Sequence, residues 1–315
     1  MTIAPEHLRT ASYADLRADG FSRAGIERAL ETGGLVRARR DYYVDGTASD
    51  ALVSAVRVGG RLDCLSLMRE FGVFVQEDDQ LLHVQVPRAR RLLRSPHSRR
   101  VRLDGRTHRV RPHWRDDDVA FDSTIACRMR ALAQAIECQR PRPAIATVDS
   151  ALNTGFIAEH ELSEVFSLVP LRLRELQRHI DGRAESGPET LARLIARTFG
   201  VSVELQVPIL GVGRVDIVVD GWIIIECDSR GFHDGWEMQE RDRRRDLAAA
   251  QRGYVTLRPT ARQIFGEPGL LLHALQGLLE LGRPDFSTRP LHNYGTALKN
   301  PDRSAGVRGR HRYLP

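Results

Sequence analysis

Three apolar segments follow one another between residues 202 and 228, and they constrain the fold more than any other part of the chain. SVELQVPI, GRVDIVVD and GWIIIECD have the length and β-branched content of buried strands. Asp220 and Gly221 join the last two, and an Asp-Gly pair indicates a tight hairpin. Helical segments flank these strands at 188–200 and 237–253, and a strand (YVTLRP) and a helix over 268–281 follow. This order predicts a mixed sheet flanked by helices, in a domain spanning 187–282.

Two carboxylates interrupt these apolar strands. Asp216 lies between Val215 and Ile217, and Glu226 follows three consecutive isoleucines. A buried charged carboxylate is strongly disfavoured unless it is paired or binds a metal. A hairpin centred on Asp220 and Gly221 makes positions 216 and 226 near-facing, so the pair predicts a site for a hard divalent cation. The alternative is that each acid lies solvated at a strand end.

The rest of the chain divides into three parts. Residues 1–48 contain two short helical segments and the basic ribbon LVRARRDYYV, an order typical of a small winged-helix module. Residues 49–181 form a mixed α/β region, with strands predicted at LLHVQVP, RVRLD and THRVRPHW and three amphipathic helices after them. The segment 180–188 has the composition of a linker, and 283–315 is a basic tail expected to be mobile. The predicted fold class is α+β / α/β.

Positive charge is concentrated in one stretch. From Arg88 to Arg115 there are eleven arginines and a single acidic residue, Asp104, although the whole chain carries only +6. Such arginine density predicts contact with nucleic-acid phosphates, and its alternative is an ordinary solvated surface. The arginines predicted to contact nucleic acid are Arg37, Arg39, Arg40, Arg88, Arg90, Arg91, Arg94, Arg99, Arg100, Arg109, Arg111, Arg243 and Arg245.

Several classes of protein are excluded on composition. Lys299 is the only lysine among 47 basic residues, which removes P-loop and Schiff-base mechanisms from the predicted domains. No apolar stretch approaches the length of a membrane span, so no membrane partner and a cytoplasmic location are expected, with nucleoid association left open. Cys64, Cys127, Cys138 and Cys227 lack metal-ligand spacing and are expected to be unpaired thiols. His108 and His113 are expected at the surface among arginines, and protein partners are unknown.

Two resemblances to known families follow from these motifs. The stretch GFSRAGIERALETGGLVRARRDYYV resembles the N-terminal winged-helix region of abortive-infection (AbiEi-like) antitoxins, and the likeness extends weakly to about residue 180. The segment GRVDIVVDGWIIIECDSRGFH, followed by ERDRRRDLAAAQRGYVTLR, resembles very-short-patch repair (Vsr-like) endonucleases within the PD-(D/E)XK superfamily. The second resemblance implies a restriction-endonuclease-like sheet and a nuclease site.

The nuclease resemblance implies roles for particular residues. Asp216 would be the principal ligand of Mg²⁺ (or Mn²⁺), joined by Glu226 and the main-chain carbonyl of Cys227. Glu189 matches a glutamate that reaches the same site, and Gln206 matches a strand glutamine of relatives.

The resemblance also implies how protons would move. Asp228 occupies the position where the wider superfamily has lysine, which is a departure from the pattern. His233 matches the histidine that takes over proton transfer, and its ordinary pKa near ~6.5 suits that role. Asp242 and Asp246 match helix acids that could orient it, with Arg243 and Arg245 near the phosphate.

These features leave three hypotheses. The first is a metal-dependent endonuclease that hydrolyses phosphodiester bonds of DNA, nicking or cleaving it, with an N-terminal DNA-binding module. The alternative is a non-catalytic DNA-binding transcriptional regulator of antitoxin type, with a degenerate nuclease domain, and the Asp228 departure favours it. The third is a nuclease that acts on RNA, because the sequence does not distinguish the two nucleic acids.

Overall fold

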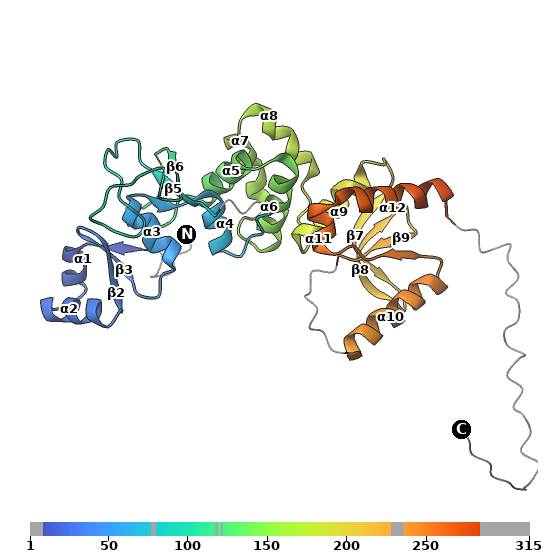
Figure 1. Ribbon diagram of the computed structural model, residues 1–315, viewed down its shortest axis with the longest axis horizontal. Coiled ribbons are helices and arrows are strands. Elements are labelled where there is room, and N and C mark those ends of the chain that lie inside the picture. Colours follow the sequence, from blue (N-terminus) through green and yellow to red (C-terminus); the bar gives the residue numbers. More distant parts are fainter. Residues whose placement is uncertain (1–8, 77–79, 117–118, 121, 228–235, 284–315) are drawn as a thin grey trace, which may run out of the picture.

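The computed structural model describes residues 9–76, 80–116, 119–120, 122–227 and 236–283. It contains helices and three separate sheets, and this confirms the predicted α+β class. Figure 1 shows an elongated arrangement in which the N-terminal elements, a central group of helices and the C-terminal sheet follow one another. Within the described residues, every helix is too short or too polar to cross a lipid bilayer.

The N-terminal part consists of helices packed beside a small antiparallel sheet of order β1-β3-β2. Ser12 and Ser22 cap the first two helices, because each side chain accepts a hydrogen bond from a backbone N–H of the first turn. The elements are β1 (Thr10–Ala11), α1 (Tyr13–Ala18), α2 (Arg23–Glu31), β2 (Leu35–Arg39), β3 (Tyr42–Asp45) and α3 (Asp50–Val58).

The central part combines a second small sheet, of order β4-β5-β6, with a group of helices. Strands β5 and β6 are parallel, with His83 beside Arg111 and Gln85 beside His113. The elements are β4 (Arg61–Leu62), α4 (Cys64–Glu70), β5 (Leu82–Val86), β6 (Val110–Trp114), α5 (Arg128–Cys138), α6 (Pro141–Asn153), η2 (Glu159–Glu161), α7 (Leu162–Leu168), α8 (Leu171–Arg174) and η3 (Glu175–His179).

One predicted strand of this part is wrong. The segment RVRLD forms only an isolated bridge, between Arg94 and Arg102. Val101 is 53% exposed, although Leu103 is partly buried, so the segment lacks the buried face of a sheet strand. Alternation of arginine with apolar residues indicates a strand only where a neighbouring strand is available to pair with it.

The C-terminal part is a four-stranded mixed sheet of order β10-β9-β8-β7, in which only β10 and β9 are parallel. Helices α9, α11 and α12 cover one face and α10 covers the other (Figure 1). The elements are α9 (Gly187–Arg197), β7 (Val203–Ile209), β8 (Gly213–Val219), β9 (Ile223–Ile225), α10 (Trp236–Gln251), β10 (Val255–Leu257), α11 (Ala261–Gly266) and α12 (Pro268–Leu281).

Helix α9 joins the central and C-terminal parts. Every residue from Gly187 to Ala196 is buried, since α6 packs on one side of the helix and the sheet on the other. A buried ion pair lies in the contact with α6, where an Arg193 NH2 nitrogen is 2.6 Å from the Asp149 carboxylate and both side chains are at most 1% exposed. The Thr190 hydroxyl and the Asp181 backbone N–H also donate to that carboxylate, each at 2.8 Å. The predicted linker 180–188 is therefore packed against α6 and includes the start of α9.

Removing one partner of this pair is expected to destabilise the protein strongly. Asp149→Ala leaves the Arg193 guanidinium buried without its carboxylate and should lower the free energy of unfolding by about 3–5 kcal/mol. Equilibrium unfolding in urea measures the change. The control is Glu27→Ala, which breaks an exposed pair between Arg23 and Glu27 and should cost about 1 kcal/mol or less. Equal destabilisation of the two variants would contradict the assigned role of the buried pair.

Candidate active site

The first turn of α9 holds the carboxylate of Glu189 at the edge of the C-terminal sheet. Ser186 caps the helix, accepting from the Glu189 N–H at 3.3 Å and donating its hydroxyl to Glu189 Oε1 at 2.8 Å. The Glu185 N–H donates to Glu189 Oε2 at 2.9 Å. This capping arrangement stabilises a carboxylate at a helix N-terminus and fixes its direction, and the residue is 5% exposed.

The side chain of Gln206 connects Glu189 to the sheet, and the backbone of Gln206 has an unusual conformation. Its Nε2 donates to Glu189 Oε2 at 2.8 Å, while its Oε1 is buried and accepts no hydrogen bond. The φ angle of Gln206 is +55°, in the left-handed region, although the residue lies inside β7. For a residue other than glycine, this backbone conformation costs about 1–2 kcal/mol, so the surrounding sheet must hold Gln206 in it. Strained residues of this kind cluster at functional sites.

The hairpin of β8 and β9 brings the two strand carboxylates to the same place. Ile217 pairs with Ile225 and Val219 with Ile223, and this register aligns position 216 with position 226. Asp216 Oδ2 accepts the backbone N–H of Cys227 at 2.8 Å. On its other side, position 216 lies opposite Gln206, between the pairs Leu205–Ile217 and Val207–Val215. The structure therefore aligns Gln206, Asp216 and Glu226 in one row across β7, β8 and the end of β9, with Glu189 hydrogen-bonded to Gln206.

The environment disfavours the ionised form of two of these acids. Burial raises the pKa of Asp216, and the nearby Glu185 carboxylate raises it further. Burial also raises the pKa of Glu189, and the charge of Asp216 acts in the same direction. Buried carboxylates that repel one another are the electrostatic condition that a bound cation relieves.

Arg245 is the counter-ion of Glu226. From α10 it donates NH2 to Glu226 Oε1 at 2.8 Å, and it also contacts the carbonyl oxygens of Val212 and Arg214. The sequence places Arg245 near a phosphate, whereas the structure places it against an acid of the site. Arg243, predicted for the same role, is exposed on the same helix.

The donor set suits a hard divalent cation. Its carboxylate oxygens and the orphaned amide oxygen of Gln206 are the ligand type that Mg²⁺ prefers. Within the described residues, no choice of one oxygen from each of Glu189, Asp216 and Glu226 places all three within 4.8 Å of one another. Because Arg245 holds Glu226, we expect cation binding to require rotation of that carboxylate away from the arginine.

Of the remaining predicted catalytic residues, some lie within the described part of the chain and others do not. Asp228 and His233 lie outside the described residues, as does the tail from 284 onward. Asp242 is described and partly buried on α10. Asp246, the second acid predicted to orient His233, accepts from the Arg258 guanidinium at 2.9–3.2 Å.

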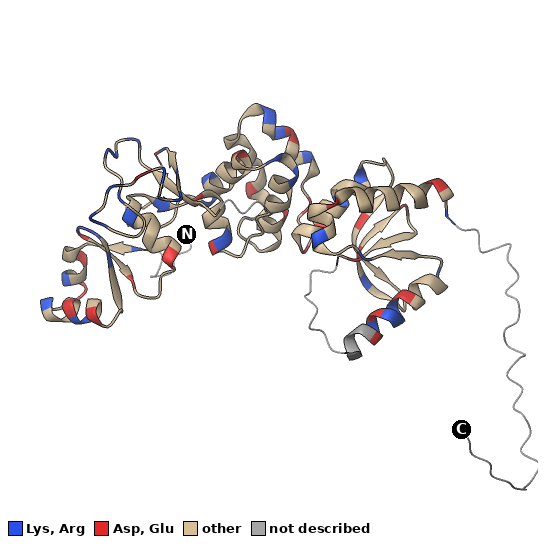
Figure 2. Cartoon of the chain, viewed as in Figure 1, with Lys and Arg blue, Asp and Glu red and all other residues tan. Residues whose placement is uncertain are grey.

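The predicted nucleic-acid-binding arginines fall into two groups. Most lie on the segment that joins β5 to β6 or near it, where Figure 2 shows basic residues along the loops. Those exposed to solvent are Arg37, Arg40, Arg88, Arg91, Arg100, Arg109 and Arg111, and those partly buried are Arg39, Arg90, Arg94 and Arg99. Arg39 points inward, donating to the carbonyl oxygens of Val58 and Leu92, and therefore supports the fold.

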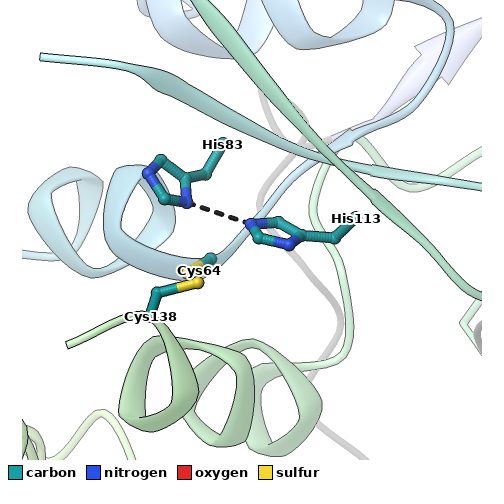
Figure 3. A group of neighbouring side chains, drawn as sticks. All are labelled: Cys64, His83, His113 and Cys138. Atoms are coloured by element: carbon teal, nitrogen blue, oxygen red, sulfur yellow. Dashed lines mark hydrogen bonds between the residues drawn. The ribbon is translucent and has the colours of Figure 1, made fainter. Parts of the chain in front are cut away.

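A second cluster of cysteine and histidine side chains is not indicated by the sequence. Cys64, His83, His113 and Cys138 come together below the β5–β6 pair, with all four ligand atoms within 4.8 Å of one another (Figure 3). The cysteines are unpaired thiols, as expected, but two of them meet in this cluster, and the expectation that His113 is a surface residue is wrong. Intervals of tens of residues separate the four positions, so no local motif could indicate them.

Comparison with known proteins identifies relatives without assigning a function. No protein-family model matches the chain. Two proteins of Mycobacterium tuberculosis, the uncharacterized proteins MT2308 and Rv2248, are each 27% identical to it over 278 residues. Each alignment covers 84% of this chain and 99% of the relative.

Neutralising the buried site carboxylate is expected to stabilise the metal-free fold. A carboxyl whose folded pKa lies above the ordinary value of 3.8 loses its stabilising contribution as the pH rises through that folded pKa. Asp216→Asn removes this effect, and its amide oxygen can still accept the Cys227 N–H. The melting temperature of the variant, measured with a chelator, should exceed that of the unmodified protein by a margin that grows as the pH rises above the ordinary carboxyl pKa of 3.8.

Asp220→Asn is the matched control for this measurement. Asp220 lies in the same hairpin but is exposed, so its replacement should produce no comparable margin. A lower melting temperature for Asp216→Asn at neutral pH would contradict the electrostatic description of the site.

Proposed function

We propose that the protein is a metal-dependent endonuclease that hydrolyses phosphodiester bonds. The observation that carries the proposal is the alignment of Gln206, Asp216 and Glu226 across the sheet, with Glu189 bound to Gln206, supported by a strained strand residue and raised carboxylate pKa values. The resemblance of residues 213–258 to Vsr-like endonucleases favours the same chemistry. DNA is the preferred substrate because the exposed arginines provide a phosphate-binding surface next to a helix-and-ribbon module.

Each residue of the site has a distinct task in this proposal. Asp216, Glu226 and the Cys227 carbonyl would hold Mg²⁺ or Mn²⁺. When bound, such an ion lowers the pKa of water and neutralises charge that develops on the phosphate. Glu189 and Gln206 orient the polar groups around Asp216, because their hydrogen bonds run from the capped end of α9 into the sheet. The assignment of proton transfer to His233 rests on the resemblance alone.

The pairing of Glu226 with Arg245 favours a second function. An arginine that neutralises a metal ligand is expected in a nuclease domain that has become inactive. The protein would then be a DNA-binding transcriptional regulator in which Arg245 takes the place of the cation. The two functions differ in one observable, namely cleavage of nucleic acid.

Cleavage should depend on the divalent ion and on Asp216. The purified protein is expected to nick or cut supercoiled plasmid with Mg²⁺ or Mn²⁺ and to be inactive with a chelator. Asp216→Asn should lower the cleavage rate by at least about 100-fold, since a bound cation contributes several kcal/mol of transition-state stabilisation. Gel electrophoresis of the plasmid measures the rate.

Glu204→Gln is the control for this assay, because Glu204 is an exposed carboxylate on the same strand as Gln206 and should be dispensable. The nuclease proposal fails if plasmid, single strands, mismatched duplex and RNA all stay intact. Cleavage of RNA alone would redirect the proposal to that substrate. Cleavage that survives both Asp216→Asn and Glu226→Gln would show that the site is elsewhere.

Binding to DNA should be dominated by phosphate contacts of the exposed arginines on and near the segment that joins β5 to β6, which form the arginine surface. Replacing Arg91, Arg100 and Arg111 with glutamine is expected to weaken binding. The slope of log affinity against log salt should become shallower by about 0.9 for each phosphate that the variant no longer neutralises. Fluorescence anisotropy with a labelled duplex at several salt concentrations measures both quantities.

A variant with an equal reduction of charge separates this surface from the effect of net charge. Arg172, Arg178 and Arg262 are exposed outside the arginine surface, and their replacement with glutamine should leave the slope nearly unchanged. Identical slopes for the two triple variants would rule out a localised phosphate-binding surface.

A further inference from the structure

Four side chains from four different elements meet in the central part of the protein. Cys64 begins α4, His83 and His113 lie on the parallel strands β5 and β6, and Cys138 ends α5. His83 Nδ1 is 3.0 Å from His113 Nε2, and both sulfurs lie beside these rings (Figure 3). Within the described part of the chain, this is the only group of three or more Cys, His, Asp or Glu residues with ligand atoms so close together.

The spacing of these atoms is close to that of a tetrahedral zinc site. Zinc bonds of ~2.3 Å to sulfur and ~2.0 Å to nitrogen place the four ligand atoms about 3.3–3.8 Å apart. The atoms here are all within 4.8 Å of one another, so movements of about an ångström would complete the tetrahedron. Two sulfur and two nitrogen ligands in this geometry select zinc among the common divalent ions.

The surrounding contacts hold the four residues in position. The Ser66 hydroxyl accepts the backbone N–H of His83 at 2.9 Å, and the Gln134 amide donates to the Cys138 sulfur at 3.7 Å. Asp63, next to Cys64, is fully buried and forms a two-point ion pair with Arg115 at 2.6 and 2.7 Å. Outer contacts of this kind orient the ligands of metal sites.

The backbone of Cys64 has a strained conformation. Its φ angle is +51°, in the left-handed region that disfavours residues with a side chain, and the thiol is fully buried. A strained residue persists only where the surrounding structure maintains it. Here the strain directs a thiol to three other potential ligands.

We propose that Cys64, His83, His113 and Cys138 bind one structural zinc ion. All four tetrahedral positions are filled by protein side chains, and this is the closed arrangement of a structural site, whereas a catalytic zinc keeps one position for water. The ion joins α4, the β5–β6 pair and α5, and it thereby fixes the base of the arginine-rich segment that connects the two strands. The site is separate from the carboxylates of the proposed nuclease site.

The zinc content of the full-length protein tests this assignment directly. Protein purified under reducing conditions without chelator should contain about one zinc per chain by plasma mass spectrometry. Cys64→Ser and His83→Ala should each reduce the zinc content more than tenfold, whereas Cys127→Ser should retain it. Cys127 is a suitable control because it is a cysteine of the same region that lies outside the cluster.

A second measurement uses the unaltered chain, because a variant that fails to fold would also lack the ion. Protein reconstituted with Co²⁺ should show the intense visible bands of tetrahedral cobalt and a near-ultraviolet thiolate-to-metal band, and addition of Zn²⁺ should abolish both. Reduced protein that takes up neither metal would overturn the proposal. So would an intact mass lighter by two hydrogens with Cys64 and Cys138 joined in a disulfide, or full zinc content in both cluster variants. None of these readouts depends on nuclease activity.

Discussion

The contact between Arg193 and Asp149 determines how the two larger parts of this protein fit together. Both charges are almost completely buried, and the two residues come from different helices, Arg193 from α9 and Asp149 from α6. The low polarity of this environment makes the pair sensitive to the removal of either partner, because the remaining charge would lack both water and counter-ion. Helix α9 therefore has one orientation relative to α6. Because the sheet packs on the other side of α9, its position relative to α6 is fixed as well.

The position of the candidate active site depends on this contact because Glu189 lies on the same helix as Arg193. The glutamate is one turn before Arg193 on the same helix, and its carboxylate is fixed by the cap of α9. From there the hydrogen bond to Gln206 reaches the strained position of β7, opposite Asp216. The polar groups of the site are thus positioned by helix capping, sheet register and one strained residue. Only Glu226 depends on a partner, Arg245, that competes with a cation.

The sequence predicts best where neighbouring residues determine the outcome. The Asp220-Gly221 turn sets the hairpin register, so the alignment of Asp216 with Glu226 follows from a few consecutive residues. Helix α12 also has the predicted limits, 268–281. The features that were missed depend on distant residues. The ion pair of Arg245 with Glu226 and the meeting of Cys64 with Cys138 leave no periodicity or spacing in the chain. RVRLD failed as a strand because its pairing with residues 93–95 stops at one bridge and two backbone hydrogen bonds.

The burial of α9 also affects how the chain can fold during synthesis. The helices of the central part leave the ribosome first, and domains generally fold in that order. Until residues 187–197 follow, however, the Asp149 carboxylate of α6 lacks its Arg193 and Thr190 donors, and the apolar surface that packs against α9 stays uncovered. The central part therefore cannot reach its final packing as an independent nascent domain. A ribosome that pauses before residue 187 would leave it exposed to chaperones and proteases, so the helix that carries Glu189 also completes the folding of the part before it.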